Sequence, residues 1–274
     1  MALNPKFLSG IVSSYSLDLS ELKIISEGPL DERSFQKSLD EILKSWGSQR
    51  YKASILLENV KIRCTTNFYE EYTLYYQGEK IISKETIDII FGDSPRYEEI
   101  KKSIDIYAKS GELYLSQRLN GNTVVKAELD ALVIARGYDG KVFLYNIEFK
   151  SDLEKKLDDE RYRKAHLQLF RSTIVLINGL LESGIISKDS EFYTFGTLSS
   201  EDWYRNVYFF VYKNGNLYAY YINHKDKSIK YQIPLNGREM KEYAYYSKDD
   251  FEYSMEKRGL ISYLLGLGNY KKYR

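Results

Sequence analysis

The prediction of the fold starts from the stretch Asn122–Lys150, which reads NTVVKAELDALVIARGYDGKVFLYNIEFK. It holds two runs rich in β-branched and apolar residues, Val124–Ala135 and Val142–Ile147. Two such runs joined by a short turn with two glycines are typical of a β-hairpin. A loop made of Tyr138-Asp139-Gly140 would put its glycine at the left-handed position that three-residue loops need, and would pair Gly137 with Lys141.

This loop predicts the register of the hairpin and therefore which side chains meet. Asp130 lies opposite Glu148, and Glu128 opposite Lys150, with Cβ atoms about 4.5–5.5 Å apart. Side chains two apart share a strand face, so one face of the first strand is expected to be polar. That face carries Lys126, Glu128 and Asp130, and the face behind it carries Val125, Ala127, Leu129 and Ala131. A two-residue loop would instead send the acids to opposite faces.

A pair of carboxylates beside a lysine suits a site for a divalent cation. Mg²⁺ and Mn²⁺ prefer hard oxygen ligands and keep several of their waters. Lys150 follows Glu148 by two residues and shares its face, so its ammonium group can hold one of those waters and help to deprotonate it. The metal would acidify the water and screen a phosphate. The hairpin therefore predicts a metal site that activates water beside a phosphate group.

Asp130, a gap of seventeen residues and then Glu148-Phe149-Lys150 resemble the motif of the PD-(D/E)XK nuclease superfamily. This superfamily includes restriction enzymes, Holliday-junction resolvases and RecB-type nucleases. The resemblance implies that Asp130, Glu148 and the carbonyl of Phe149 bind Mg²⁺ or Mn²⁺, and that Lys150 acts on the attacking water. The proline that usually precedes the first aspartate is absent, because Leu129 occupies that place.

Two further residues complete the expected site. Related nucleases often bring a Gln, Arg, Lys or Tyr to it from the following helix, expected here over 165–181. We take Gln168 as the accessory catalytic residue, on a helix face that Lys164 and Arg171 share through their spacing. Glu128 is the candidate for an extra metal ligand. His166, beside core positions of the same helix, is interpreted as structural.

The same residues allow other interpretations. The pattern D-x(n)-E-x-K is weak, and antiparallel sheets often leave one face in water, so the acids could form a solvated face. Against this, Asp130 lies inside a largely apolar run, where an unpaired buried charge is costly. Two alternatives to a DNA nuclease stay open: a non-catalytic nucleic-acid-binding or virion/assembly protein that keeps the fold, and a nuclease that acts on RNA.

The order of elements around the hairpin predicts an α/β protein. A helix over 95–109, a strand over 112–119, the hairpin, the helix over 165–181 and a strand over 207–212 follow one another. This αβββαβ order is that of the restriction-endonuclease-like core, a mixed sheet flanked by helices. The expected parts are an N-terminal α/β segment of unknown role (1–93), the nuclease-like core (94–224), and a C-terminal strand with a helical basic tail (225–274).

The N-terminal segment predicts one helix and three strands. An amphipathic helix runs from Asp31 to Trp46, with Phe35 and Leu39 on its apolar side and Gly47 ending it. Strands are expected over 53–64, 68–77 and 80–91. On the helix over 95–109, Glu98 and Glu99 could supply another acid to the site, but first-turn acids solvated at the helix dipole are the favoured interpretation.

Composition sets the remaining bounds. The 274 residues carry a net charge of +1, so nucleic-acid binding must use local patches. One cysteine excludes an intrachain disulfide and a cysteine-cluster zinc site, and two histidines disfavour a histidine-rich one. Without a long apolar run or an N-terminal leader, we expect an intracellular, cytoplasmic protein that contacts no membrane. Abundant Lys and Glu agree with a thermophilic source, an archaeal host or its virus for instance.

The expected partner is nucleic acid, with DNA as the favoured substrate. The chain has 27 tyrosines, which could stack on bases but are more simply strand residues with a polar end. The basic segment over 268–274 could contact phosphate. The apolar residues between Met255 and Leu267 suit packing or self-association, so a homodimer is one expectation.

Overall fold

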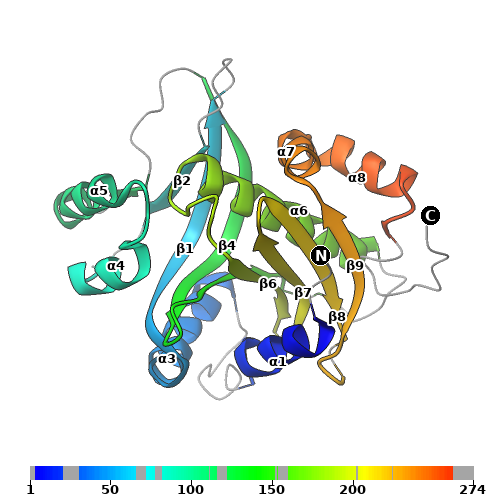
Figure 1. Ribbon diagram of the computed structural model, residues 1–274, viewed down its shortest axis with the longest axis horizontal. Coiled ribbons are helices and arrows are strands. Elements are labelled where there is room, and N and C mark those ends of the chain that lie inside the picture. Colours follow the sequence, from blue (N-terminus) through cyan, green and yellow to red (C-terminus); the bar gives the residue numbers. More distant parts are fainter. Residues whose placement is uncertain are drawn as a thin grey trace.

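The structure is a computed structural model that describes residues 4–20, 31–65, 72–77, 82–110, 112–115, 122–151, 153, 160–201, 203–223 and 225–261. Its strands are β1 (Tyr51–Thr65), β2 (Tyr72–Gln77), β3 (Glu112–Tyr114), β4 (Thr123–Gly137), β5 (Val142–Phe149), β6 (Phe192–Ser200), β7 (Trp203–Lys213), β8 (Asn216–Ile222) and β9 (Ile229–Leu235). They form one nine-stranded sheet in the order β3-β2-β1-β4-β5-β6-β7-β8-β9 (Figure 1). The pair β5–β6 is parallel and the other neighbouring pairs are antiparallel.

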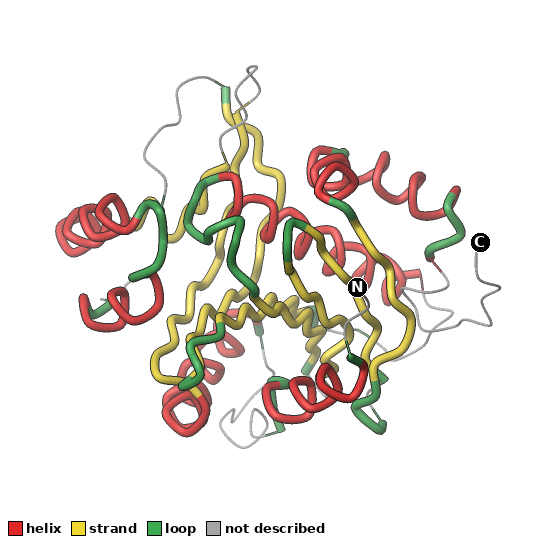
Figure 2. Tube along the Cα trace, viewed as in Figure 1, coloured by secondary structure: helices red, strands yellow, loops and turns green. Residues whose placement is uncertain are grey.

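Helices cover both faces of this sheet, which confirms the α/β class (Figure 2). They are α1 (Pro5–Tyr15), α3 (Glu32–Arg50), α4 (Lys84–Phe91), α5 (Tyr97–Ser110), α6 (Glu160–Glu182), α7 (Gly237–Tyr245) and α8 (Lys248–Lys257). Among the described residues, no helix is long and apolar enough to cross a membrane.

Two apolar clusters fill the space between the sheet and the helices. The α6-side cluster contains residues of α4 to α8, such as Ile174, and the α3-side cluster contains residues of α1 and α3, such as Phe35. Along β5, Leu144 belongs to the α6-side cluster and its neighbours Phe143 and Tyr145 to the α3-side cluster. Because strand side chains alternate between faces, the clusters occupy opposite faces of the sheet.

The hairpin β4–β5 has the predicted three-residue loop. Gly137 donates its backbone N–H to the carbonyl of Lys141 at 2.8 Å. Gly140 has φ +80°, the left-handed conformation that glycine adopts at little cost. The paired residues run from Arg136 opposite Val142 to Ala131 opposite Ile147. The next step of this register brings Asp130 to Glu148, as the loop length predicts.

Side chains were expected to alternate regularly between the two faces of the sheet along β4, and this prediction is wrong at Asp130. Ala127 and Leu129 belong to the α6-side cluster, whereas Ala131 belongs to the α3-side cluster. Residues two apart share a face only in a regular strand, so the chain changes face between Leu129 and Ala131. Glu128 and Asp130 therefore do not project from one continuous polar face.

The cause of this change lies in the neighbouring strand β1. Asn59 falls between the partners of Leu129 and Ala131 and has φ +52°, a left-handed conformation that asparagine tolerates better than most residues. From α3, the buried side chain of Gln36 donates to Oδ1 of Asn59 at 3.1 Å and to the carbonyl of Asp130 at 2.8 Å. The amide of Gln36 thus binds both β1 and β4 at the position where their pairing is irregular.

The first strand of the three-stranded antiparallel unit is β1 instead of the predicted strand over 112–119. In the described residues β3 is short and pairs with β2, while β1 pairs with β4 from Tyr51 to Thr65. The helix before this unit is accordingly α3 and not the helix over 95–109. Residues 51–65, expected in the N-terminal segment, form a central strand because they match β4 in length and in buried residues.

Two other predictions for this part of the chain are wrong. The strand expected over 80–91 contains the helix α4, because Ser83 caps it by accepting from the N–H of Thr86 and Ile87 and Ile90 are buried at helical spacing. The helix α3 does not end at Gly47 but continues to Arg50, whose guanidinium donates to the carbonyl of Ser14 at 2.8 Å. This contact ties its last turn to α1.

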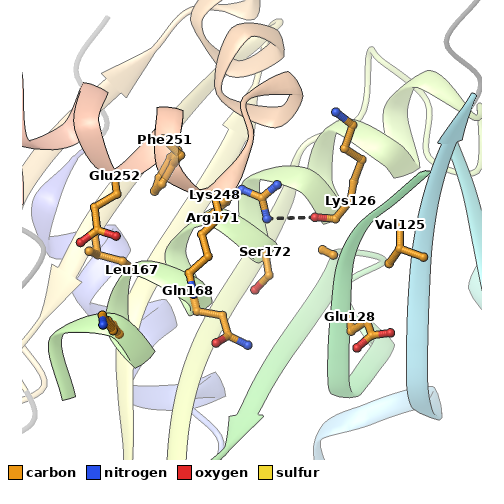
Figure 3. A pocket seen from close by; sticks show the side chains of 12 residues that line it. Val125, Lys126, Glu128, Leu167, Gln168, Arg171, Ser172, Lys248, Phe251 and Glu252 are labelled. Carbon is orange, nitrogen blue, oxygen red and sulfur yellow. Dashed lines mark hydrogen bonds between the residues drawn. The ribbon is translucent and has the colours of Figure 1, made fainter. Parts of the chain in front are cut away.

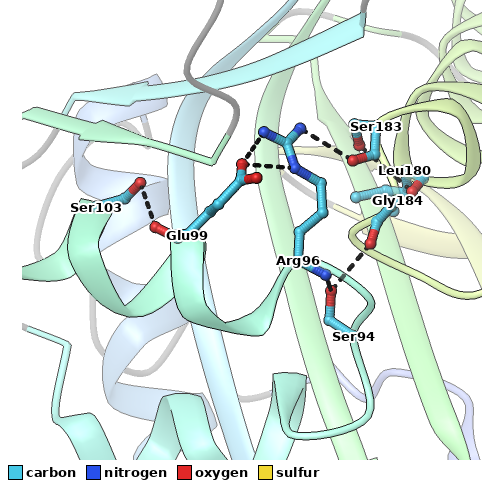
Figure 4. Close-up of polar contacts among 7 residues, drawn as sticks. All are labelled: Ser94, Arg96, Glu99, Ser103, Leu180, Ser183 and Gly184. Atoms are coloured by element: carbon cyan, nitrogen blue, oxygen red, sulfur yellow. Dashed lines mark hydrogen bonds and ion pairs between the residues drawn. The ribbon is translucent and has the colours of Figure 1, made fainter.

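The helix α5 is anchored to the end of α6 (Figure 4). Ser94 donates its hydroxyl to the carbonyl of Gly184 at 3.0 Å and accepts from the N–H of Arg96. Arg96 donates to the carbonyl of Ser183 at 3.0 Å and binds the carboxylate of Glu99. The basic segment expected over 268–274 lies outside the described residues.

Candidate active site

Asp130, in the middle of β4, lies beside Glu148, near the end of β5. Oδ2 of Asp130 accepts a hydrogen bond of 2.7 Å from the backbone N–H of Phe149, the residue after Glu148. The side chain of Glu148 is fully buried, and it has the same strand parity as Leu144, which faces α6. Asp130 and Glu148 thus lie together as predicted, and Phe149 contacts Asp130 through its backbone N–H.

The two oxygens of Glu148 have different surroundings. Oε1 accepts a hydrogen bond of 2.5 Å from Nε2 of Gln168 and forms an ion pair with Nζ of Lys150. Oε2 is buried and has no hydrogen-bond partner among the described residues. A carboxylate oxygen offers two acceptor sites, so this atom is buried with its acceptor capacity unfilled. Such an atom costs free energy unless a ligand or cation occupies it.

Burial raises the pKa of Glu148 to about 8, and the charge of Asp130 adds to the rise. Burial also raises the pKa of Asp130 to about 6, although Lys150 and the N–H of Phe149 oppose it. For Lys150, burial lowers the pKa, but the attraction of Glu148 outweighs it and the net shift is upward. Two carboxyls that resist ionisation beside a stable ammonium group are typical of functional sites.

Glu32 is a further acid whose charge acts on the pair as a minor cause, and this role was not predicted from the sequence. It begins α3, and its charge raises the pKa values of Asp130, Glu148 and Lys150. One turn later, the ring of Phe35 stacks on Phe149 with centroids 4.7 Å apart. Helical spacing could have indicated its position. Glu32 lies three to four residues, or one helical turn, before the first buried residues of α3, and therefore on the same side of the helix.

Glu128 takes a different position from the one expected. Its carboxylate forms an ion pair of 3.1 Å with Lys61 on β1, and its side chain is 62% exposed. The charge of Glu128 still contributes to the raised pKa of Asp130, as a minor cause. It lies near the acid pair but is held by Lys61.

The predicted face of α6 lines a cavity of about 470 Å³ (Figure 3). Lys164, Gln168 and Arg171 all border it, which confirms that they share a face. Residues of β4 and α8 form its other walls. His166 points elsewhere: it is 1% exposed and its Nδ1 lies 2.9 Å from the hydroxyl of Tyr208, in agreement with the structural role expected for it.

The acids on α5 have other roles. Glu99 binds Arg96 with an Nε–Oε2 distance of 2.8 Å, in the contact that joins α5 to the end of α6 (Figure 4). This agrees with the favoured interpretation of Glu98 and Glu99 as first-turn acids. The helix that brings an acid to the pair is α3.

The donor set fits a hard divalent cation with few protein ligands. Among the described residues, no group of three or more His, Cys, Asp and Glu side chains is arranged to hold a metal ion. Mg²⁺ does not require such a group, since one or two carboxylates plus waters and substrate phosphates commonly hold it. Asp130 and Glu148 supply two carboxylates, and the unfilled Oε2 is available for a cation.

The comparisons with known proteins add no relative. No family model, no curated protein and no solved structure matches this chain. The function is therefore inferred from the residues of the chain itself.

Proposed function

We propose that the protein is a metal-dependent nuclease that hydrolyses phosphodiester bonds in DNA. The observation that carries this proposal is the state of Glu148. It is fully buried beside Asp130, with Lys150 and Gln168 on one oxygen and no hydrogen-bond partner for the other in the part of the chain that the structure describes. A purely structural hairpin gains little from such a group, because well-packed apolar residues at buried ion-pair positions are often as stable or more so.

The chain topology supports a restriction-endonuclease-like core. The elements α3, β1, β4, β5, α6 and β6 follow in the order helix, three strands, helix, strand. The strands β1, β4 and β5 are antiparallel neighbours, and β6 is parallel to β5. This is the αβββαβ order inferred from the sequence, with β2, α4, α5 and β3 inserted between its first two strands. It is built from an earlier helix and an earlier first strand than expected, and its last strand is β6 and not the strand expected over 207–212.

Asp130, Glu148 and the carbonyl of Phe149 are the residues that would hold Mg²⁺ or Mn²⁺. The ion would supply Lewis acidity at a phosphoryl oxygen and lower the pKa of water. Gln168 fixes the carboxylate of Glu148 by its hydrogen bond. Lys150, charged and 37% exposed, reaches solvent while its Nζ touches Glu148, so it can orient the attacking water and offset developing negative charge.

The test is cleavage of labelled single-stranded, double-stranded and branched DNA, and of matched RNA, with Mg²⁺, Mn²⁺ or EDTA. Wild type is compared with Asp130→Ala and Lys150→Ala, and with Glu41→Ala as a control for an exposed acid on α3. Metal-dependent cutting that both site variants lose while remaining folded supports the proposal. Cutting of RNA alone would favour the RNA-directed alternative.

The same experiment separates an enzyme from a binding protein. If no preparation cuts any substrate and calorimetry detects no Mg²⁺ or Mn²⁺ binding, the buried acid pair has a structural role and is not a metal site. The non-catalytic nucleic-acid-binding protein would then be the better interpretation.

A further inference from the structure

We propose that the cavity between β4, α6 and α8 holds an unpaired DNA strand by its phosphates. The proposal rests on the nuclease function above and names the form of its substrate. The cavity measures about 470 Å³ and is bordered by residues of all three elements (Figure 3).

Gln168 connects this cavity to the acid pair. Its side chain borders the cavity and also donates to Oε1 of Glu148 at 2.5 Å. Glu128 lies at the same end of the cavity as Gln168, two residues before Asp130 (Figure 3). A strand that occupies the cavity would therefore continue directly onto the site where the phosphodiester is cut.

The charge of the lining suits a polyanion. Four cationic side chains border the cavity against two anionic ones, in a chain whose net charge is only +1. These are Lys126, Lys164, Arg171 and Lys248 against Glu128 and Glu252. Concave surfaces lined by one sign of charge concentrate oppositely charged ligands, and phosphates supply most of the affinity for nucleic acid.

The cations divide into a fixed pair and an exposed pair. Arg171 donates to the carbonyls of Lys126 and Tyr246 at 2.9 and 3.1 Å, and Nζ of Lys126 donates to the carbonyl of Tyr245 at 3.0 Å. These bonds join β4, α6 and the end of α7 and so hold the walls in place. Lys164 and Lys248 are exposed, which leaves them to contact phosphates.

Lys248 is the cation best placed to contact phosphate. It begins α8, is exposed, and has no ion-pair partner among the described residues. Lys164 on the facing helix is paired with Glu160 at an exposed position, where such pairs contribute little. The two lysines border the cavity from α8 and α6, so they can contact successive phosphates of one strand.

The volume of the cavity and the inaccessible aromatic ring in its lining argue for a single strand that is bound independently of its base sequence. The volume lies in the range of about 300–1,000 Å³ that small-molecule pockets have, which suits one or two nucleotides and not a duplex. The aromatic residue of the lining, Phe251, is only 1% exposed, so it cannot stack on a base. Recognition then falls to phosphates, which carry no direct sequence information.

The experiment measures binding without cleavage. Fluorescence anisotropy in EDTA compares short labelled oligo-dT, oligo-dA and a duplex of equal length across about 50 to 200 mM salt. The variants are Lys248→Ala and Lys248→Glu, with Lys225→Ala as the control, since Lys225 is exposed in the turn between β8 and β9. An acid in the first turn of a helix is compatible with its dipole, so both Lys248 variants should fold.

We expect oligo-dT and oligo-dA to bind alike and more tightly than the duplex. Lys248→Ala should lower the slope of log affinity against log salt by about 0.7, the value for one phosphate contact on a single strand. Lys248→Glu should weaken binding by about tenfold or more at low salt. Lys225→Ala should match wild type.

Unchanged binding by Lys248→Glu, or tighter binding of the duplex, would overturn the cavity proposal. Failure of the nuclease function looks different. If oligonucleotides bind and Lys248 matters, but nothing is cut with Mg²⁺ or Mn²⁺, the strand site stands and hydrolysis falls. If metal-dependent cutting occurs with the same KM in Lys248→Glu as in wild type, hydrolysis stands and the strand site falls.

Discussion

Gln168 on α6 donates a hydrogen bond of 2.5 Å to the buried carboxylate of Glu148 on β5. The bond fixes the orientation of the carboxylate and leaves Oε2 as the oxygen to which no described residue donates a hydrogen bond. Residues that orient a ligand in this way are commonly worth about 10–100-fold in metal affinity or activity. The helix α6 therefore contributes to the site through one exposed side chain.

For Gln168→Ala we expect a loss of about 10–100-fold in metal-dependent cleavage with little change in melting temperature, because Gln168 is exposed. Steady-state kinetics and thermal melts measure the two effects. Glu41→Ala, which removes an exposed acid from α3, is the control and should behave as wild type. Equal activity of Gln168→Ala and wild type would contradict the orienting role.

The raised pKa of Glu148 predicts how the stability of the metal-free protein depends on pH. The group binds its proton more tightly in the folded state, so its contribution is complete below pH 4.5 and is lost as the pH rises through about 8. Urea unfolding in EDTA across this window should show falling stability. The raised pKa of Asp130, about 6, adds to the slope in its lower part, so Glu148→Gln should flatten the slope mainly above pH 6. Asp139 and Glu191, whose pKa values are lowered, act below this window and do not mask the effect. The same slope in both proteins would refute the assignment.

Divalent cations should stabilise the folded protein. A ligand at about 100 times its Kd adds about 2.7 kcal/mol to the free energy of unfolding, which is roughly 5–10 °C for a chain of this size. We expect Mn²⁺ to raise the melting temperature of wild type and of Glu41→Gln, but not of Asp130→Asn. A shift of the same size in Asp130→Asn would mean that the ion binds elsewhere.

Glu32 should tune the acid pair. Its negative charge raises the pKa values of Asp130 and Glu148, so Glu32→Gln should lower both. The fall in stability between the ordinary carboxyl range and about pH 8 should then end at a lower pH and be smaller in total, which urea unfolding in EDTA would detect. Glu41→Gln removes an exposed acid from the same helix and should leave the profile where it is.

The irregular point opposite Asp130 should be sensitive to backbone preference. Asn59 has φ +52°, and a residue that avoids the left-handed region pays about 1–2 kcal/mol there. We expect Asn59→Val to lower the free energy of unfolding by at least that amount, with a smaller loss for Asn59→Gly, since glycine adopts this conformation freely. Equal losses in the two variants would show that the lost contact with Gln36, and not the backbone, decides.

The hairpin was predictable because its determinants are local. A loop of Tyr138-Asp139-Gly140 sets the register, and the register brings Asp130 to Glu148 without help from the rest of the chain. The predicted face of α6 also follows from local spacing, since Lys164, Gln168 and Arg171 border the same cavity.

What the sequence did not reveal depends on distant pairing. Nothing local indicates that β4 pairs with β1, so the nearer strand over 112–119 was preferred. Glu32 was missed for the same reason, because its place at the site depends on how α3 packs through Phe35. For α4, the β-branched residues favoured a strand, while the cap at Ser83 decided for a helix.

The change of face at Asp130 was not predicted either, but for a different reason. It arises from the left-handed Asn59 and the amide of Gln36, which meet only in the folded state. Periodicity assumes a regular strand and cannot register such an irregularity. The assumption of a regular strand therefore placed Glu128 closer to Asp130 and Glu148 than the structure does.

The chain leaves β1 and enters β4 at one place, since Thr65 and Thr123 are paired partners. The intervening segment, which includes β2, α4, α5 and β3, is thus an excursion whose two ends are already held together. The entropy of closing such a loop grows only slowly with its length. Evolution could therefore lengthen, shorten or exchange this segment in homologous chains while Glu32, Asp130 and Glu148 kept their positions.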